Sequence, residues 1–285
     1  MTSKPENNHN LSKNEVDIDE YQNDKWHELR RFTQARIGLG RAGVSLPTHH
    51  QLQFNLDHAA ARDAVHIPLN CETIVQELAN HSLPHVRLHS RAQHRSEYLQ
   101  RPDLGRRLNR ASVETLTQYQ STQSTSSDVA IVLADGLSSV AVQSQGSELS
   151  RKLIESLTNH SLRVSPICIV EQGRVAIGDE IGELLQAKSV VLIVGERPGL
   201  SSPDSLGIYY TYAPKLGLTD ANRNCISNIR PAGLSIDDAV ARCCWLILEA
   251  NKLGYSGVNL KDKSQESADN AAAINSPTGN FLLGN

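Results

Sequence analysis

The sequence lacks the patterns that mark several common protein classes. Its five cysteines form no CxxC pair and no zinc-finger spacing. An odd number of cysteines without a signal peptide predicts reduced thiols and a cytoplasmic protein. No apolar run approaches the ~20 residues that a membrane-spanning helix requires. These absences argue against a disulfide scaffold, a zinc finger and a membrane protein.

Lysine is missing from residues 26–120, where twelve arginines stand beside eight acidic residues. Arginine makes flat, bidentate contacts to carboxylates and phosphates, so this segment predicts specific contacts to an anionic group or to a partner chain. The arginines alternate with acidic and apolar residues, and the formal net charge of the chain is −3. We therefore expect neither nucleic acid nor a membrane as a partner.

Histidine is missing after His160, and ten of the eleven histidines precede residue 95. His81, His85 and His89 are four residues apart, which on one helix would place them on one face as metal ligands. Pro84 interrupts this spacing, and the intervening residues alternate as in a strand or loop. We therefore favour solvent-facing or hydrogen-bonded histidines and predict no metal site.

A G-x-G-x-x-G pattern occurs at Gly38, Gly40 and Gly43. A dinucleotide-binding fingerprint needs a strand before this pattern and a helix opening from its last glycine. Here residues 26–37 have helical spacing and Val-Ser-Leu-Pro follows the last glycine. We interpret the pattern as a helix stop followed by a loop.

The arginine-rich segment 101–108 allows two interpretations. It lies after predicted helices over residues 48–65 and 71–83. In the first interpretation it is a turn, in which Pro102 opens a new helix and Asp103 complements the helix dipole. In the second, its arginines bind an anionic group or a partner chain. Both interpretations remain open at this point.

The second half of the chain alternates strands and helices. This order predicts a parallel sheet with right-handed crossovers, an α/β fold that is Rossmann-like but lacks the glycine fingerprint. A mainly helical N-terminal region precedes it. The predicted strands are residues 129–134, 162–170, 189–194 and 206–212, and the predicted helices are residues 147–160, 179–187 and 235–253, the last capped by Ser235.

Composition divides the chain into four regions. We expect a disordered tail over residues 1–25, a mainly helical, arginine-rich and partner-contacting region over 26–120, a Rossmann-like domain over 128–261 and a C-terminal tail over 262–285. A Ser/Thr/Gln-rich linker over 118–127 separates the two central regions.

Three loops are predicted to meet at the carboxyl edge of the sheet: residues 135–138, 171–175 and 195–205. A turn over residues 222–228 leads from there to the last helix. These loops supply glycine-flanked amides, hydroxyls and the pair Glu196 and Arg197, which suit a large polar ligand. Without histidine they can form neither a Ser-His-Asp nor a Cys-His site, so we predict a binding surface and no catalytic residue.

Each candidate residue in these loops also has a structural alternative. Glu196 and Arg197 are able to form a simple surface pair, Val175 to pack under the sheet, and Cys225 to be an inert buried thiol. From the residues alone both interpretations stay open.

Four motifs point to a known family: VGERPGL from Val194, RNCISNIRPAG from Arg223, YLQRPDLGRRL from Tyr98 and ARIGLGRAG from Ala35. In this order and spacing they resemble the small (light) subunit of ethanolamine ammonia-lyase. The resemblance extends over residues 26–261.

The resemblance implies an adenosylcobalamin-dependent lyase that converts ethanolamine to acetaldehyde and ammonia by a radical mechanism. In this family a large TIM-barrel subunit carries the substrate site, so catalytic residues are expected on that partner. The small subunit holds the corrinoid against the barrel, and six large and six small subunits form a heterododecamer. The family's cobalamin contacts correspond to Val175, Glu196 and Cys225, and all three residue types match.

The resemblance also bears on the form of the cofactor and on localisation. A D-x-H-x-x-G motif that would replace the lower axial base does not occur, so cobalamin is expected in its base-on form. We expect a cytoplasmic complex; some family members enter bacterial microcompartments, but residues 1–25 show little of the apolar periodicity of a leader helix. Two alternatives are a stand-alone nucleotide- or flavin-binding module and an interaction protein without a cofactor.

Overall fold

A computed structural model describes residues 25–264 of the chain. Nearly all of the two predicted tails, over residues 1–25 and 262–285, therefore lies outside the described residues. The chain forms two compact units, residues 1–58 and 59–285.

The first unit contains a short 3-10 helix, η2 (Lys25–Arg31), and most of helix α1 (Thr48–His66). The predicted helical spacing over residues 26–37 therefore yields only about two turns of 3-10 helix before the chain becomes irregular. Gly38, Gly40 and Gly43 all have positive φ, of 59°, 70° and 63°. The loop interpretation of the G-x-G-x-x-G pattern is confirmed, because helices and strands do not use this left-handed conformation.

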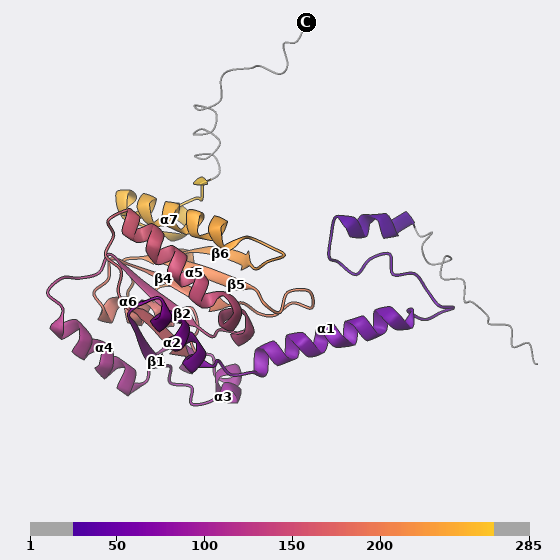
Figure 1. Ribbon diagram of the computed structural model, residues 1–285, viewed down its shortest axis with the longest axis horizontal. Helices are drawn as coiled ribbons and strands as arrows, with labels where there is room; N and C mark the ends of the chain where they lie inside the picture. The colour runs from indigo at the N-terminus through magenta and orange to yellow at the C-terminus, as the bar shows by residue number, and fades with distance from the viewer. Residues whose placement is uncertain (1–24, 265–285) are drawn as a thin grey trace, which may run out of the picture. The chain divides into compact units, whose positions relative to one another are not determined.

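The second unit is built on one six-stranded sheet with the strand order β1-β3-β2-β4-β5-β6. Figure 1 shows the sheet with helices on both of its faces. Its strands are β1 (His85–His89), β2 (Val129–Ala134), β3 (Ile167–Glu171), β4 (Ser189–Gly195), β5 (Leu206–Tyr212) and β6 (Arg223–Ile229). Its helices are α2 (Cys71–Asn80), α3 (Arg95–Gln100), α4 (Arg110–Thr122), α5 (Ser139–Asn159), α6 (Ile177–Leu184) and α7 (Ile236–Leu253), with the 3-10 helices η3 (Leu104–Arg106), η4 (Asp220–Asn222) and η5 (Gly257–Asn259).

The α/β class is confirmed, but the sheet is mixed and not fully parallel. Strands β1, β3, β2 and β4 are parallel, whereas β5 is antiparallel to β4 and β6 is antiparallel to β5. Residues 196–205 connect β4 to β5, and this link is too short for the crossover that a parallel neighbour requires. The segment 222–228, predicted as a turn, is mostly strand β6. Strand β1 comes from the N-terminal half, so the sheet extends beyond the predicted C-terminal domain.

Helix boundaries follow their capping residues. Helix α5 begins at Ser139 and not at Ser147 as predicted, because the Ser138 hydroxyl accepts a hydrogen bond from the Ala141 amide at 3.2 Å and caps the helix there. The predicted cap of α7 is confirmed, since the Ser235 side chain accepts from the Asp238 amide at 3.1 Å. The segment 118–127, predicted as a linker, continues helix α4 as far as Thr122.

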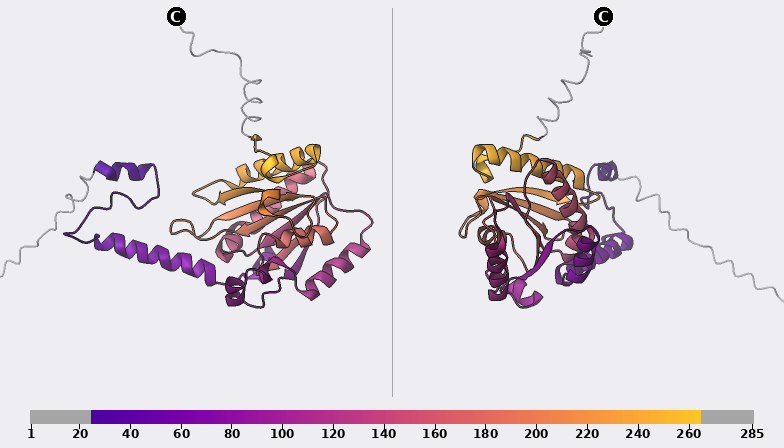
Figure 2. Two further views of the ribbon diagram at one scale, coloured as in Figure 1. Left: turned by 180° about the vertical axis from the view of Figure 1, so that it is seen from behind. Right: turned by 60° about the vertical axis from the view of Figure 1, so that its left-hand side comes forward.

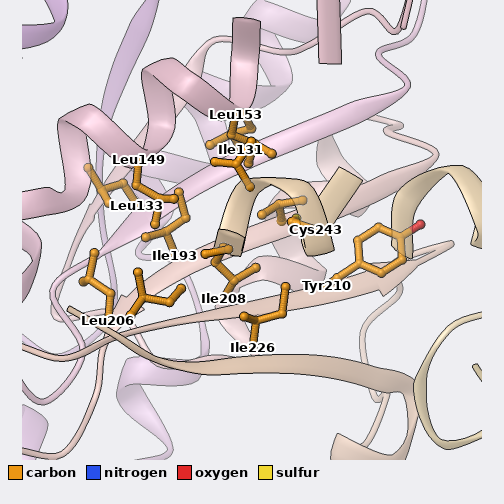
Figure 3. Packing of buried hydrophobic residues seen from close by; sticks show 14 of the residues in the cluster. Ile131, Leu133, Leu149, Leu153, Ile193, Leu206, Ile208, Tyr210, Ile226 and Cys243 are labelled. Carbon is orange, nitrogen blue, oxygen red and sulfur yellow. The ribbon is translucent and has the colours of Figure 1, made fainter. Parts of the chain in front are cut away.

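Alternate strand residues pack into two hydrophobic layers, one on each face of the sheet. Ile131 and Leu133 pack with α2, α5 and α7, whereas Val132 and Ala134 pack with α4 and α6. Figure 3 shows the first layer, in which Leu149 and Leu153 of α5 and Cys243 of α7 meet the strand residues. All six residues of β2 are buried, as a strand covered on both faces requires.

Helix coverage differs along the sheet. On the first face α7 packs on β5 and β6, while on the second face α6 packs on β2 and β4 and α4 packs on β1. Figure 2 shows the yellow helix α7 along the β5–β6 side of the sheet. On the second face the β5 residue Tyr209 is half-buried and the β6 residue Cys225 is exposed. None of the helices in the described part of the chain has the length and apolar character that crossing a membrane requires.

Candidate ligand-binding site

The loops that follow β2, β3 and β4 meet at the carboxyl edge of the sheet, as predicted. The Asp135 carboxylate accepts hydrogen bonds from the amides of Gln172 at 3.0 Å and Gly173 at 2.9 Å. The Leu137 amide donates to the Gly195 carbonyl at 2.9 Å. The end of β2 is thus tied directly to the loops on both of its neighbours.

Asp135 is fully buried and faces the Arg95 guanidinium, with 3.3 Å between Oδ2 and Nη1. Burial raises the pKa of Asp135 from 3.8 to about 6, although Arg95 and the surrounding amides favour the ionised form. Arg95 also donates to the carbonyls of Gly136 at 2.8 Å and Val65 at 2.6 Å. This buried network holds the loops that border the site in one arrangement.

The ends of β2 and β4 approach each other so closely that only glycine fits. A Cβ on Gly195 would lie 2.0 Å from the Ser138 carbonyl oxygen, and one on Gly136 would lie 2.2 Å from the Gly195 oxygen. Gly136 also has a positive φ of 57°. The first glycine of the GERPG motif is therefore required by backbone packing.

A cavity of about 920 Å³ opens beside these loops. It is bordered by the segment that contains η3, the start of α6, the loop after β4, strand β5 and the residues before β6. This volume lies near the upper end of the range of about 300–1,000 Å³ that is usual for small-molecule and cofactor sites. Among residues 25–264, none of those that line the cavity is a histidine.

The structure brings the three predicted site residues to this region. Val175 and Glu196 line the cavity. Cys225 does not line it, but it lies directly opposite Tyr209 in the β5–β6 register, and Tyr209 lines the cavity. Cys225 is exposed, so its alternative role as an inert buried thiol is wrong. Val175 also packs against the α4 and α6 layer, so its structural alternative is confirmed, while its contact with a cofactor stays a prediction.

Glu196 joins the two strands that follow it. Its Oε2 atom accepts hydrogen bonds from the Ser205 hydroxyl at 2.7 Å and from the Asn228 amide at 3.2 Å. Within residues 25–264 it forms no ion pair with Arg197, so the surface-pair alternative is wrong. The Glu196 side chain therefore positions the rim of the cavity.

Two charged residues at the site were not predicted from the sequence. Arg223 forms a bidentate ion pair with Asp179, with Nη1–Oδ1 and Nη2–Oδ2 distances of 2.6 and 2.9 Å. Both side chains are 3% exposed, and both residues line the cavity. The available signals were the arginine that opens the RNCISN motif and the acidic first turn of α6, but nothing in their spacing links them.

Two of the three histidines at the four-residue spacing have hydrogen-bond partners in the backbone. His85 and His89 lie in strand β1 and contact the carbonyls of Leu83 and Ser90 through Nδ1, at 3.0 and 2.8 Å. The hydrogen-bonded interpretation is confirmed for both. In the described part of the chain no three His, Cys, Asp or Glu side chains are grouped as metal ligands.

The turn interpretation of segment 101–108 is confirmed, whereas binding of an anionic ligand or a partner chain by its arginines stays a prediction. Arg101 pairs with Asp103 at the surface, at 2.7 Å, as a turn would have it. Arg107 binds Glu180 of α6 at 3.0 Å, and Arg106 lines the cavity. The segment is therefore a turn whose last arginines reach the site.

The chain is similar to known proteins over most of its length. Residues 23–261 match the family described as "Ethanolamine ammonia-lyase light chain (EutC)". The chain is 52% identical over 274 residues to the ethanolamine ammonia-lyase small subunit of Pseudomonas syringae pv. tomato, covering 95% of this chain and 96% of that one. It is 50% identical over 259 residues to the protein of the same name from Pseudomonas putida, covering 91% of this chain and 95% of that one. The Pseudomonas aeruginosa protein of that name is 52% identical over 258 residues, or 90% of this chain and 94% of its own.

Proposed function

The chain belongs to the ethanolamine ammonia-lyase light-chain family, and from this membership we propose that it is the subunit that holds adenosylcobalamin in that enzyme. The complex converts ethanolamine to acetaldehyde and ammonia, and the reacting substrate lies on a large subunit. The observation that carries the proposal is the cavity of about 920 Å³ that Val175 and Glu196 line, with Cys225 on the adjoining open face of β5–β6.

The residues present fit a corrinoid, which is a large, flat ring fringed with amide side chains. Val175 offers an apolar surface, and Glu196 retains its Oε1 atom as an acceptor while Oε2 is held by Ser205 and Asn228. Beyond helix α6, the face of β5–β6 with Tyr209 and Cys225 provides a broad surface. Volume, acceptor groups and an open sheet face together suit such a ligand.

The division of labour follows from the residue types at the site. When bound, adenosylcobalamin supplies an organic radical by homolysis of its Co–C bond. The residues of this chain orient the cofactor and exclude water from its buried side. Because no histidine is among the described residues that line the cavity, residues 25–264 offer no imidazole there to replace the cofactor's own base, which supports the base-on form.

The arrangement of the complex is proposed on the same basis. Residues 128–261 supply most of the cobalamin-binding cavity, to which Tyr98, Arg106 and Arg107 also contribute. Residues 26–120 also contact the large TIM-barrel subunit. Six large and six small subunits assemble in the cytoplasm, with a bacterial microcompartment as the alternative location.

The decisive test is cofactor retention by the complex of this chain with its large subunit. The complex is loaded with hydroxocobalamin and passed through gel filtration, and the visible spectrum of the protein peak gives the amount bound. The variant Glu196→Ala is expected to weaken retention at least about tenfold, the effect of losing a hydrogen bond to a charged group. Its elution volume should stay that of the assembled complex.

The matched control is Glu155→Ala, which removes an exposed carboxylate paired with Arg151 on helix α5 and should retain cobalamin as the wild type does. Unchanged retention by Glu196→Ala would remove the role assigned to Glu196. Tight binding of flavin or NAD, with no binding of cobalamin, would instead support a nucleotide-binding module.

A further inference from the structure

Arginine side chains without a carboxylate partner gather at the cavity. Five arginines line it: Arg106, Arg107, Arg174, Arg197 and Arg223. Arg107 and Arg223 are each held by an acidic residue of helix α6. Among residues 25–264, the other three form no ion pair within 4.0 Å.

Arg174 and Arg106 belong to the same wall. The Arg174 amide donates to the Gly105 carbonyl at 2.8 Å, which places residue 174 beside the residue that precedes Arg106. A Cβ on Gly105 would lie 2.9 Å from Cγ of Arg174, so the two segments are in close contact. The wall therefore presents two guanidinium-bearing residues from separate segments.

The Arg174 side chain is held in place without being neutralised. Its guanidinium lies over the Tyr98 ring, 4.5 Å from the ring centroid, and Nη2 donates to the Tyr98 carbonyl at 3.0 Å. Tyr98 is itself buried, with its hydroxyl donating to the Gly173 carbonyl at 3.2 Å. These contacts preorganise the cation, but a carbonyl and a ring do not supply a negative charge.

The acidic residues that line the same cavity are already engaged. Asp179 binds Arg223, and Asp220 lies 3.5 Å from the same arginine. The Oε2 atom of Glu196 is bound to Ser205 and Asn228, and within residues 25–264 Glu196 forms no ion pair with Arg106 or Arg174. Arg174 is half-buried and Arg106 is exposed. Because a half-buried guanidinium without a counter-ion is unfavourable, Arg174 favours a ligand group that carries a negative charge, and Arg106 adds a second cation beside it. Arginine forks match the oxygens of phosphate groups in particular.

We propose that Arg106 and Arg174 form the subsite that binds the phosphodiester of the cobalamin nucleotide loop. This inference rests on the proposed cobalamin function. The phosphodiester is the one anionic group of cobalamin, which otherwise presents neutral amides and an aromatic base. The subsite thus gives a role to Arg106, the arginine of the segment 98–108 that forms no ion pair within residues 25–264.

The test compares two corrinoids on the assembled complex. Hydroxocobalamin carries the phosphodiester, whereas aquocobinamide ends before it and also lacks the ribose and base. Arg106→Gln and Arg174→Gln are each expected to weaken cobalamin binding about ten- to a hundredfold, as the loss of a charged hydrogen bond does. Cobinamide binding should change less than about twofold. Binding is measured by spectral titration, and inorganic phosphate should compete with cobalamin but not with cobinamide.

Two variants control for structural effects. Arg110→Gln removes an arginine that is 93% exposed and pairs with Glu114, and it should bind both corrinoids as the wild type does. Arg174→Gln also loses the contacts to Tyr98. The decisive variant is therefore Arg106→Gln, because the native Arg106 side chain makes no hydrogen bond within residues 25–264. Its thermal unfolding should match that of the wild type.

The outcomes separate the subsite from the cofactor function. If the wild type binds both corrinoids and Arg106→Gln weakens both equally, or weakens neither, the subsite is refuted and the cofactor function stands. If the wild type binds neither corrinoid, the proposed function fails and the subsite fails with it.

Discussion

The buried ion pair between Asp179 and Arg223 allows the sharpest test of how this site is held together. It joins the first turn of α6 to the first residue of β6, across the cavity wall. Each side chain is 3% exposed, and the two N–O distances are 2.6 and 2.9 Å. The change to make is Asp179→Ala, which removes the anion and leaves the cation in place.

The expected loss follows from what remains around Arg223. Its other contacts are the Thr211 hydroxyl at 3.4 Å and the Leu218 carbonyl at 3.1 Å, both uncharged. Asp220 is 3.5 Å away but its side chain is 98% exposed, so water screens it. Removing one partner of a buried pair costs about 3–5 kcal/mol in the free energy of unfolding. We expect Asp179→Ala to fall in that range.

Replacing both partners should restore much of this loss. In the double variant Asp179→Leu with Arg223→Met no buried charge is left unpaired, and such replacements are often neutral or stabilising by about 1–4 kcal/mol relative to the pair. The double variant should therefore be more stable than Asp179→Ala.

Urea unfolding followed by circular dichroism measures these free energies from the midpoint and the slope. Asp103→Ala serves as the control, because its pair with Arg101 is about 60% exposed on both sides and such pairs contribute about 1 kcal/mol or less. A loss below about 1 kcal/mol for Asp179→Ala would contradict the reasoning, and so would a double variant as unstable as the single one.

Two further predictions concern the loops around Asp135. Gly195→Ala should destabilise the chain by about 3 kcal/mol or more, because the new Cβ would lie 2.0 Å from the Ser138 oxygen; a normal urea midpoint would contradict this. The pKa of Asp135 is raised from 3.8 to about 6 in the folded state, so the folded chain binds more protons than the unfolded chain between these values. The Asp135 contribution to stability is therefore fully present below about pH 4 and is lost as the pH rises through about 6, with a slope of at most about 1.4 kcal/mol per pH unit. Urea midpoints measured against pH should show this fall for the wild type but not for Asp135→Asn, and parallel curves would contradict it.

Local sequence patterns located most of the sheet core. The apolar runs of β2 and β5 have the predicted boundaries, and β4 extends the prediction by Gly195 alone. A run of β-branched and apolar residues identifies a buried strand because both of its faces must be covered. Ser235 likewise marked the start of α7. Capping is a local interaction, in which the Ser235 hydroxyl accepts a hydrogen bond from the amide of Asp238, three residues later.

The errors came from pairing between distant segments. The direction of β5 depends on the residues that follow Gly195, and the strand itself has the same composition in either orientation. Strand β6 carries Asn224 and Asn228, which are typical of turns, yet the Asn224 side chain is used to donate to the carbonyls of Gly257 and Leu260. Such residues enter a strand when a tertiary contact satisfies their side chains.

The candidate site shows the same division. That the loops after β2, β3 and β4 meet was predictable, because the carboxyl ends of parallel strands lie at one edge. That Glu196 contacts Ser205 and Asn228, and that Arg174 lies over Tyr98, was not. These contacts join residues far apart in the chain, and residue type alone does not specify the partner.

The sequence by itself determined the family, the strand-forming segments and the three positions proposed to contact the cofactor, because these depend on residue order and on short-range periodicity. Only the tertiary structure decided which arginines are neutralised and which are left for a ligand. That difference depends on whether a carboxylate lies within about 4 Å of the guanidinium, and the fold sets this distance. Arg107 and Arg223 are paired with the acidic first turn of α6. Arg106 and Arg174 are left facing the cavity.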